Sequence, residues 1–223
     1  MIKYLKLSFL LTIIIVCVLL GFWQVDRGQE KSMLYEDYVN KSSLPPKLII
    51  NSTDSVTQYT TVKLKGQFNN ERQFLLDNKI NNKKAGYEVI TPVAFEDKIV
   101  LVNRGWVTNN NRQFLPNINV DYNVSDIIGY AYFYGESYQL ATDHYIDDWP
   151  ILIQSINIKN ISKVLNKEIL PFVIVMNQKQ KNSYMIQEIH TKNPVLKHYM
   201  YAGQWFLFAL IGIVFMVLLS RKE

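Results

Sequence analysis

Three groups of side chains in this sequence have types and spacings that can do chemistry. The first is an acidic cluster with one histidine, made of Asp143, His144, Asp147 and Asp148. Carboxylate and imidazole ligands can bind a hard cation, which would suit a hydrolase or a metalloenzyme. The spacing matches no calcium loop or zinc pattern, so we interpret the cluster as a solvated loop. No phosphate-binding loop, nucleophile elbow or H-E-x-x-H motif accompanies it.

The second group is the run Asn103-Arg104-Gly105-Trp106, which lies in a segment that we expect to be a β-strand. In the structural interpretation, Trp106 enters the core, Arg104 stacks or pairs, and Gly105 lets another backbone approach closely. In the alternative interpretation, this run contacts a ligand. We favour the structural interpretation.

The third group lies at the ends of two long uncharged stretches of the chain. His198 stands directly before the second stretch. The aromatic and amide side chains on the same two ends are Trp23, Gln24, Tyr201, Gln204 and Trp205. A histidine there can simply reach a membrane surface, but neutral imidazole is also a common axial ligand of haem iron. Above two packed aromatic helices, His198 can hold an amphipathic macrocycle whose hydrocarbon lies in lipid.

The two uncharged stretches predict transmembrane helices at residues 7–25 and 199–220. At about 1.5 Å per residue they span roughly 28 Å and 33 Å, close to the ~30 Å of a bilayer's hydrocarbon core. No small-residue cleavage pattern follows the first stretch, so we expect it to be an uncleaved anchor. Two spans place residues 26–198 on the opposite side of the membrane from both termini.

Charge sets the expected orientation. The short tails at residues 1–6 and 221–223 are basic, and short basic tails stay in the cytoplasm. Long domains translocate largely regardless of their own charge. We therefore expect a multi-pass protein with both termini cytoplasmic and residues 26–198 in the periplasm. No Arg-rich transit peptide precedes the first span, which favours the inner (plasma) membrane of a bacterium.

Small and amide residues predict how the two helices meet. Ala202 and Ala209 are seven residues apart on one face and Gly203 is adjacent, so we expect close packing there. Buried amides need partners, so Gln24 and Gln204 are expected to hydrogen bond across the helix pair. The neighbouring aromatic residues are typical of an interfacial belt.

Residues 26–198 predict one domain that is mainly antiparallel β, barrel- or sandwich-like, with short helices. Residues 27–39 should continue the first helix, which Pro45-Pro46 then ends. Strands are expected at 62–68, 74–76, 87–95, 99–107, 127–134, 151–158 and 172–176, with a polar turn at 78–84 and a short helix at 160–167. The second strand should pair with the first, and the third and fourth should form a hairpin. Pro92 predicts an edge or a bulge in its strand.

Composition excludes several classes of protein. Cys17 is the only cysteine and lies in the first span, so the domain has no disulfide, thiol nucleophile or cysteine-based metal site. The chain carries a net charge of +5, but residues 26–198 hold 20 basic and 18 acidic side chains, a net of +2. A nucleic-acid binder needs a concentrated basic face, and none is visible.

At these residues the chain resembles the surfeit locus protein 1 family, membrane proteins that assist cytochrome c oxidase assembly. Gly21-Phe22-Trp23-Gln24 with Arg27 is similar to the family's G-x-W-Q-x-x-R. The segment from Gly86-Tyr87 through Pro92 to residues 102–107 is similar to its G-Y…T-P…V-N-R-G-W block. The third block, similar to H-x-x-Y-A-x-Q-W-F, consists of His198, Tyr201, Ala202, Gln204, Trp205 and Phe206. Three blocks in order, with two anchors, make the likeness specific.

The resemblance implies a haem a chaperone, not an enzyme, that assists insertion of haem a into the catalytic subunit of an aa3-type oxidase. It makes His198 the axial ligand of the haem iron. The residues that it implies along the macrocycle are Tyr201, Trp205 and Trp23, and those that steady the helices or meet a propionate are Gln24, Gln204, Arg27 and Arg104. The implied partners are the catalytic oxidase subunit, haem A synthase and the lipid bilayer.

Two residues depart from the family pattern, and two other functions stay open. Lys197 stands where an asparagine is frequent, which bears on haem affinity, and Thr108 where a proline is frequent, which bears on a turn. The first alternative function is a membrane-anchored scaffold that holds oxidase subunits together and binds no haem. The second is an external hydrolase or metalloenzyme that uses the acidic cluster at residues 143–148.

Overall fold

A computed structural model of the chain describes residues 2–51, 54–109, 114–120, 124–135, 149–177, 180–186 and 195–221. It contains two compact units, one formed by Met1–Val39 with Ile189–Glu223 and the other by Asn40–Glu188. The elements are α1 (Ile2–Ser42), β1 (Lys47–Leu48), β2 (Thr61–Phe68), β3 (Phe74–Asn81), β4 (Lys84–Phe95), β5 (Lys98–Thr108), β6 (Ser125–Tyr132), β7 (Ile151–Ile153), α2 (Ile158–Leu165), β8 (Ile169–Met176) and α3 (Val195–Arg221). The acidic cluster at residues 143–148 lies outside the described residues.

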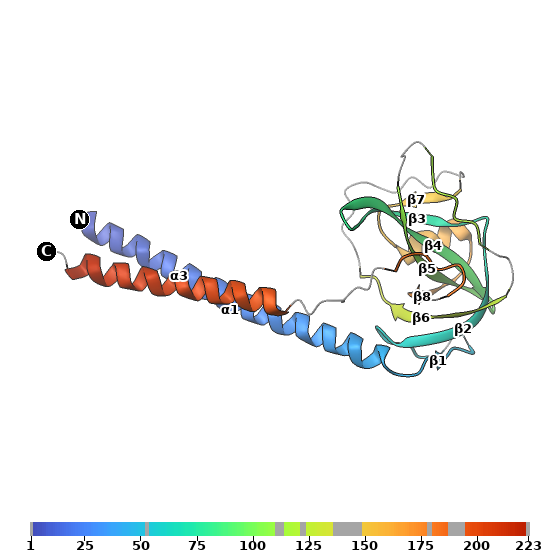
Figure 1. Cartoon of the computed structure of the whole chain (residues 1–223), viewed down its shortest axis with the longest axis horizontal. Coiled ribbons are helices and arrows are strands. Elements are labelled where there is room, and N and C mark those ends of the chain that lie inside the picture. The colour runs from blue at the N-terminus through green and yellow to red at the C-terminus, as the bar shows by residue number, and fades with distance from the viewer. Residues whose placement is uncertain are drawn as a thin grey trace. The chain divides into compact units, whose positions relative to one another are not determined.

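The first unit is an antiparallel pair of long helices, α1 and α3, with both chain ends at the same end of the pair (Figure 1). Each is long and apolar enough to cross a membrane. The helix predicted to continue beyond the first span is confirmed, since α1 runs without a break to Ser42. It ends before Pro45-Pro46, where the helical N–H pattern cannot continue.

The two helices meet along a seam whose residues recur at alternating steps of four and three. On α1 these residues are Leu10, Ile14, Cys17, Gly21, Gln24 and Gly28, and on α3 they are His198, Ala202, Trp205, Ala209, Gly212 and Met216. This is the repeat of helices that pack knobs into holes at a shallow crossing angle. At its centre Ile14, Cys17 and Ala209 form a buried apolar cluster.

Glycines let large side chains fill this seam. A Cβ added to Gly21 would lie 2.5 Å from the ring of Phe206, and one added to Gly212 would lie 2.8 Å from Ile14. Ala202 and Ala209 are buried, as predicted. The prediction for Gly203 is wrong, because nothing lies within 4 Å of an added Cβ there. One residue along a helix is a 100° rotation, which turns Gly203 out of the seam.

The second unit is built on an eight-stranded sheet that closes on itself (Figure 1). Its order is β1-β2-β6-β8-β5-β4-β3-β7, and an added pairing between β2 and β4 closes a ring of the five strands β2, β6, β8, β5 and β4. Three pairs are parallel, namely β1–β2, β3–β7 and β5–β8, and the others are antiparallel. The predicted barrel-like, mainly antiparallel domain is therefore confirmed.

Alternating apolar residues of all five ring strands form the core inside the barrel. On β2, for example, Val62 and Leu64 are fully buried. A second cluster lies on the outer side of the sheet, where α2 covers it with Ile161 and Leu165. The Asn157 side chain caps α2 by accepting the Asn160 N–H, so the helix begins slightly earlier than predicted.

Three sequence predictions, one about strand pairing and two about the bounds of a turn and a strand, are wrong. β3 pairs with β4 and β7, not with β2. The turn expected at 78–84 is a two-residue turn at Asn82-Lys83, whose φ angles of 48° and 65° suit a tight hairpin. The strand expected at 151–158 ends at Ile153, because the following residues form the turn into α2. The hairpin of β4 with β5 is as predicted.

Pro92 marks the point at which β4 changes partners. β3 pairs with β4 up to Ile90, and β2 pairs with it from Val93. Proline has no N–H to donate, and a gap between two partner strands requires none there. The Pro92 carbonyl still accepts the Asn69 N–H at 2.8 Å. Pro92 therefore lies neither at an edge nor at the β4 irregularity, which falls between Glu88 and Ile90.

Closure of the barrel predicts a steep penalty for enlarging Gly129 on β6. An added Cβ would lie 2.1 Å from the Val175 carbonyl oxygen of β8, so the two strands must move apart. Gly129→Ala is expected to lower the free energy of unfolding by about 1–3 kcal/mol, the usual effect of overpacking. The measurement is thermal unfolding of the full chain in detergent. Gly135→Ala, where nothing lies within 4 Å, is the matched control and should unfold like the wild type.

Candidate functional site

The site in the first unit centres on one polar contact between the two helices. The Nδ1 of His198 on α3 lies 2.8 Å from the Oε1 of Gln24 on α1. A carbonyl oxygen can only accept, so the proton of this hydrogen bond belongs to Nδ1. In the neutral imidazole, Nε2 then carries a lone pair that can bind a metal. The prediction that Gln24 bonds across the helix pair is confirmed, with His198 as its partner.

Glycine packing holds His198 close to α1. A Cβ added to Gly28 would lie 3.3 Å from the His198 Cβ and 2.9 Å from the Tyr199 ring. Gln24 and Gly28 are four residues apart on α1 and therefore lie on one face of that helix. One face thus provides both the hydrogen bond to His198 and the space for its backbone.

Two of the predicted aromatic residues share a face of α3 with His198. Tyr201 and Trp205 follow it by three and seven residues, which brings them to the same side of a helix. Trp205 packs against the buried seam cluster and meets Phe208 edge to face, with ring centroids 6.0 Å apart. Tyr201 is 44% exposed. The His198 imidazole, the partly exposed Tyr201 ring and the Trp205 ring packed on the seam can together border a flat aromatic ligand.

Three other predicted residues lie farther from this contact. Trp23 is one 100° step from Gln24 and is 56% exposed, while its neighbour Phe22 packs on Phe206 at 5.3 Å. Arg27 shares a face with Gln24 and forms an ion pair with Glu30. Among the described residues, the amide contact across the seam is made by Gln24 and not by the exposed Gln204. The roles of these residues toward a ligand stay predictions.

Arg104, predicted from the second unit, is the centre of a buried polar network. Its side chain is only 1% exposed. Its donors reach the carbonyl oxygens of Ile118 at 2.7 Å and Asn182 at 2.9 Å, and the Gln73 Oε1 at 3.0 Å. The guanidinium also lies 4.9 Å from the centre of the Tyr184 ring. Burial lowers the pKa of Arg104, and Tyr184 opposes that shift.

The residues after Arg104 anchor the segment 180–186, the last described residues of the second unit. Gly105 has a φ of 111°, and a Cβ there would lie 2.9 Å from the Met185 carbonyl oxygen. The Trp106 N–H donates to that carbonyl at 2.7 Å, and its indole N–H donates to the Lys79 carbonyl at 3.1 Å. The run makes the contacts expected in the structural interpretation, with the segment 180–186 as the backbone that approaches. The role of Arg104 toward a ligand stays a prediction.

Sequence reasoning missed three residues of these two sites. Gln73 and Thr91 complete the Arg104 network, and their hydroxyl–amide contact is 2.6 Å. No signal in a single sequence points to them, since Thr91 is an ordinary residue of β4 and Gln73 is a single polar residue directly before β3. Gly28 was also missed. Ile14, Gly21 and Gly28 recur every seven residues, and this spacing could have revealed the seam.

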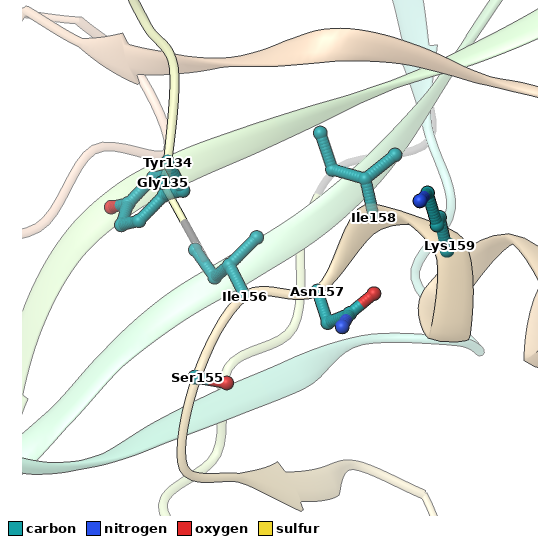
Figure 2. A pocket seen from close by; sticks show the side chains of 7 residues that line it. All are labelled: Tyr134, Gly135, Ser155, Ile156, Asn157, Ile158 and Lys159. Carbon is teal, nitrogen blue, oxygen red and sulfur yellow. The ribbon is translucent and has the colours of Figure 1, made fainter. Parts of the chain in front are cut away.

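A cavity of about 330 Å³ lies elsewhere in the second unit (Figure 2). It is lined by Tyr134, Gly135 and residues 155–159 at the start of α2. Burial, with a contribution from the Glu88 carboxylate, raises the pKa of Tyr134, so its hydroxyl stays protonated at neutral pH. Among the described residues that line it, Lys159 has the only charged side chain. The described part of the lining provides no acid–base pair, and the described residues contain no cluster of three metal-ligating side chains.

Two apolar helices that pack around a polar pair, with a β-barrel domain inserted in the sequence between them, define a membrane-anchored protein. The chain belongs to the SURF1 family, whose model matches residues 11–210. This is the family indicated by the three sequence blocks. Its members assist assembly of cytochrome c oxidase.

Individual relatives agree with this assignment. The chain is 29% identical over 216 residues to a SURF1-like protein of Rickettsia conorii, and the aligned residues cover 93% of this chain and 88% of the relative. It is 28% identical over 228 residues to a SURF1-like protein of Rickettsia prowazekii, covering 98% and 91%. A SURF1-like protein of Drosophila melanogaster is 31% identical over 109 residues, covering 40% of this chain and 36% of the relative.

The Arg104 network predicts a large loss of stability when its donor is removed. Arg104→Met keeps an apolar side chain of similar length. It removes the donor of the Asn182 carbonyl, and it removes one of the two donors of the Ile118 carbonyl and of the Gln73 Oε1. The expected loss is at least about 2 kcal/mol, the scale on which hydrogen bonds to a charged group contribute to stability. Arg72→Met, at an exposed arginine of the same unit, is the matched control and should stay within about 0.5 kcal/mol of wild type.

Chemical denaturation of the full chain in detergent measures this difference. Amide hydrogen exchange adds local information, because Tyr184 and Trp106 donate their N–H groups to Arg104 and Met185. Both amides should exchange faster in Arg104→Met. Equal stability of Arg104→Met and Arg72→Met would contradict the assigned structural role.

Proposed function

We propose that this protein binds haem a as cargo through His198 and assists its insertion into the catalytic subunit of an aa3-type cytochrome c oxidase. It does so as an assembly factor and not as an enzyme. Membership in a family of oxidase assembly factors supports the oxidase as the partner. The hydrogen bond between His198 and Gln24 supports the ligand, and it is the observation on which the proposal rests.

The chemistry of the donor set fits a haem. Iron in haem takes imidazole nitrogen as an axial ligand, and the second nitrogen of such an imidazole is normally hydrogen bonded. His198 has this arrangement, since its Nδ1–H donates a hydrogen bond to the Gln24 Oε1 and Nε2 remains available for the iron. Tyr201 and Trp205 lie on the same side of α3 and would border the macrocycle.

The position of His198 beside an apolar helix would suit an amphipathic cargo. His198 directly precedes the apolar stretch of α3, so a ligand there can keep its hydrocarbon in lipid and its polar edge outside. Basic tails at both ends support an arrangement in which both termini are cytoplasmic and residues 26–198 are periplasmic, in the bacterial inner membrane. Haem A synthase would be the source of the cargo in this scheme.

Absorption spectroscopy of the detergent-purified full chain tests the proposal. The protein from cells that make haem a should show a haem a spectrum, and His198→Ala should lower haem occupancy by more than about tenfold because the axial ligand is gone. Added imidazole should restore part of the spectrum in His198→Ala, since it supplies the missing donor. His190→Ala is the control for loss of a histidine and should bind like the wild type.

A haem-free wild type purified from these cells would contradict haem binding and favour a scaffold that holds oxidase subunits together. The host oxidase then decides between the two functions. Haem delivery predicts that His198→Ala lowers the haem a content of the assembled oxidase. A scaffold predicts that this variant assembles the oxidase normally.

A further inference from the structure

We infer that Gln24 is the positioning residue for His198: its amide oxygen holds the proton on Nδ1, so that Nε2 is the nitrogen presented to the haem iron. This inference rests on the proposed function for the identity of the metal. The state of the imidazole itself belongs to the protein without haem and can be measured there.

The first step of the argument is the choice between two nitrogens. A free neutral histidine exchanges its proton between Nδ1 and Nε2, and only the unprotonated nitrogen can bind a metal. The 2.8 Å contact with the Gln24 Oε1 is available only when Nδ1 carries the proton. Gln24 therefore removes one of the two tautomers.

The second step is orientation of the ring. His198 is held by the hydrogen bond at Gln24 and by backbone packing at Gly28, one turn farther along α1. These two contacts restrict rotation about its side-chain bonds, so that Nε2 points in one direction. Ligands held by such outer contacts bind metal more tightly, and loss of the contact typically lowers affinity about 10–100-fold.

The third step is the environment of the contact. Gln24 stands near the end of the uncharged stretch of α1, and its contact with His198 is part-buried, which limits the water that can compete for its amide. An amide that loses its partner in an apolar layer is destabilised, so the bond to His198 is favoured over separate solvation of the two groups. Leucine at position 24 would keep an apolar side chain of similar size and remove the amide with its acceptor oxygen.

Nitrogen-15 NMR of the haem-free full chain, labelled at histidine and held in detergent, tests the tautomer directly. The chemical shifts of the two ring nitrogens show which one carries the proton. Wild type should show protonated Nδ1, and Gln24→Leu should show a mixture of both tautomers. Gln24→Glu restores an acceptor oxygen and should return the proton to Nδ1. Gln29→Leu, at an exposed glutamine on the same helix, is the matched control and should resemble the wild type.

Haem a titration of the same four proteins tests the consequence. Gln24→Leu should bind haem a about 10–100-fold more weakly. Gln24→Glu should bind at or near wild-type affinity and lower the haem reduction potential, because a carboxylate acceptor makes the imidazole a stronger donor. A merely structural role for Gln24 would not move the potential.

Several results would overturn the inference. Protonated Nε2 in the wild type would do so, as would a Gln24→Leu protein with unchanged tautomer and affinity. A wild type that binds no haem while keeping protonated Nδ1 sinks the proposed function, yet still supports control of the tautomer by Gln24. The two failures are therefore distinguishable.

Discussion

Two helices can approach only as closely as the side chains between them allow, and this constraint governs the first unit. Gly21, Gly28 and Gly212 have no side chain, so rings and branched side chains from the opposite helix fill the seam. Close approach in turn brings Gln24 within hydrogen-bond distance of His198. Polar groups that lie between apolar helices are destabilised unless they hydrogen bond to each other. Packing and hydrogen bonding therefore favour the same geometry. The imidazole is held by the same contacts that hold the helices.

The second unit also buries a polar side chain where partners meet it, and here that side chain carries a full positive charge. Arg104 is buried among neutral acceptors from distant parts of the chain, and its position joins the barrel to the segment 180–186. Its neighbours complete the attachment, since Gly105 leaves room for the Met185 backbone and Trp106 bonds to it. The sequence block around Arg104 thus attaches the segment 180–186 to the barrel. The imidazole suited to bind metal lies in the helix pair.

The predictions that succeeded depended on local patterns. Alternating polarity indicated β2, and the short connection between two strand-like segments indicated the hairpin of β4 and β5. The predictions that failed concerned choices among partners. β3 pairs with β4 because Asn82-Lys83 makes a tight turn, and Pro92 occupies a gap that appears only when β4 is shared between two strands. Gly203 and Gln204 face away from the seam, although their residue types suggested packing or bonding.

The sequence by itself determined the two apolar helices, the β-rich domain between them and the family, because each follows from composition and short-range pattern. Tertiary structure alone decided which polar groups meet. His198 and Gln24 are 174 positions apart, and Arg104 and Asn182 are 78 apart. A residue's preference for water or apolar surroundings is a property of its side chain and its near neighbours. Pairing depends instead on the rotation of each helix and the register of each strand, which are set only when the whole unit packs.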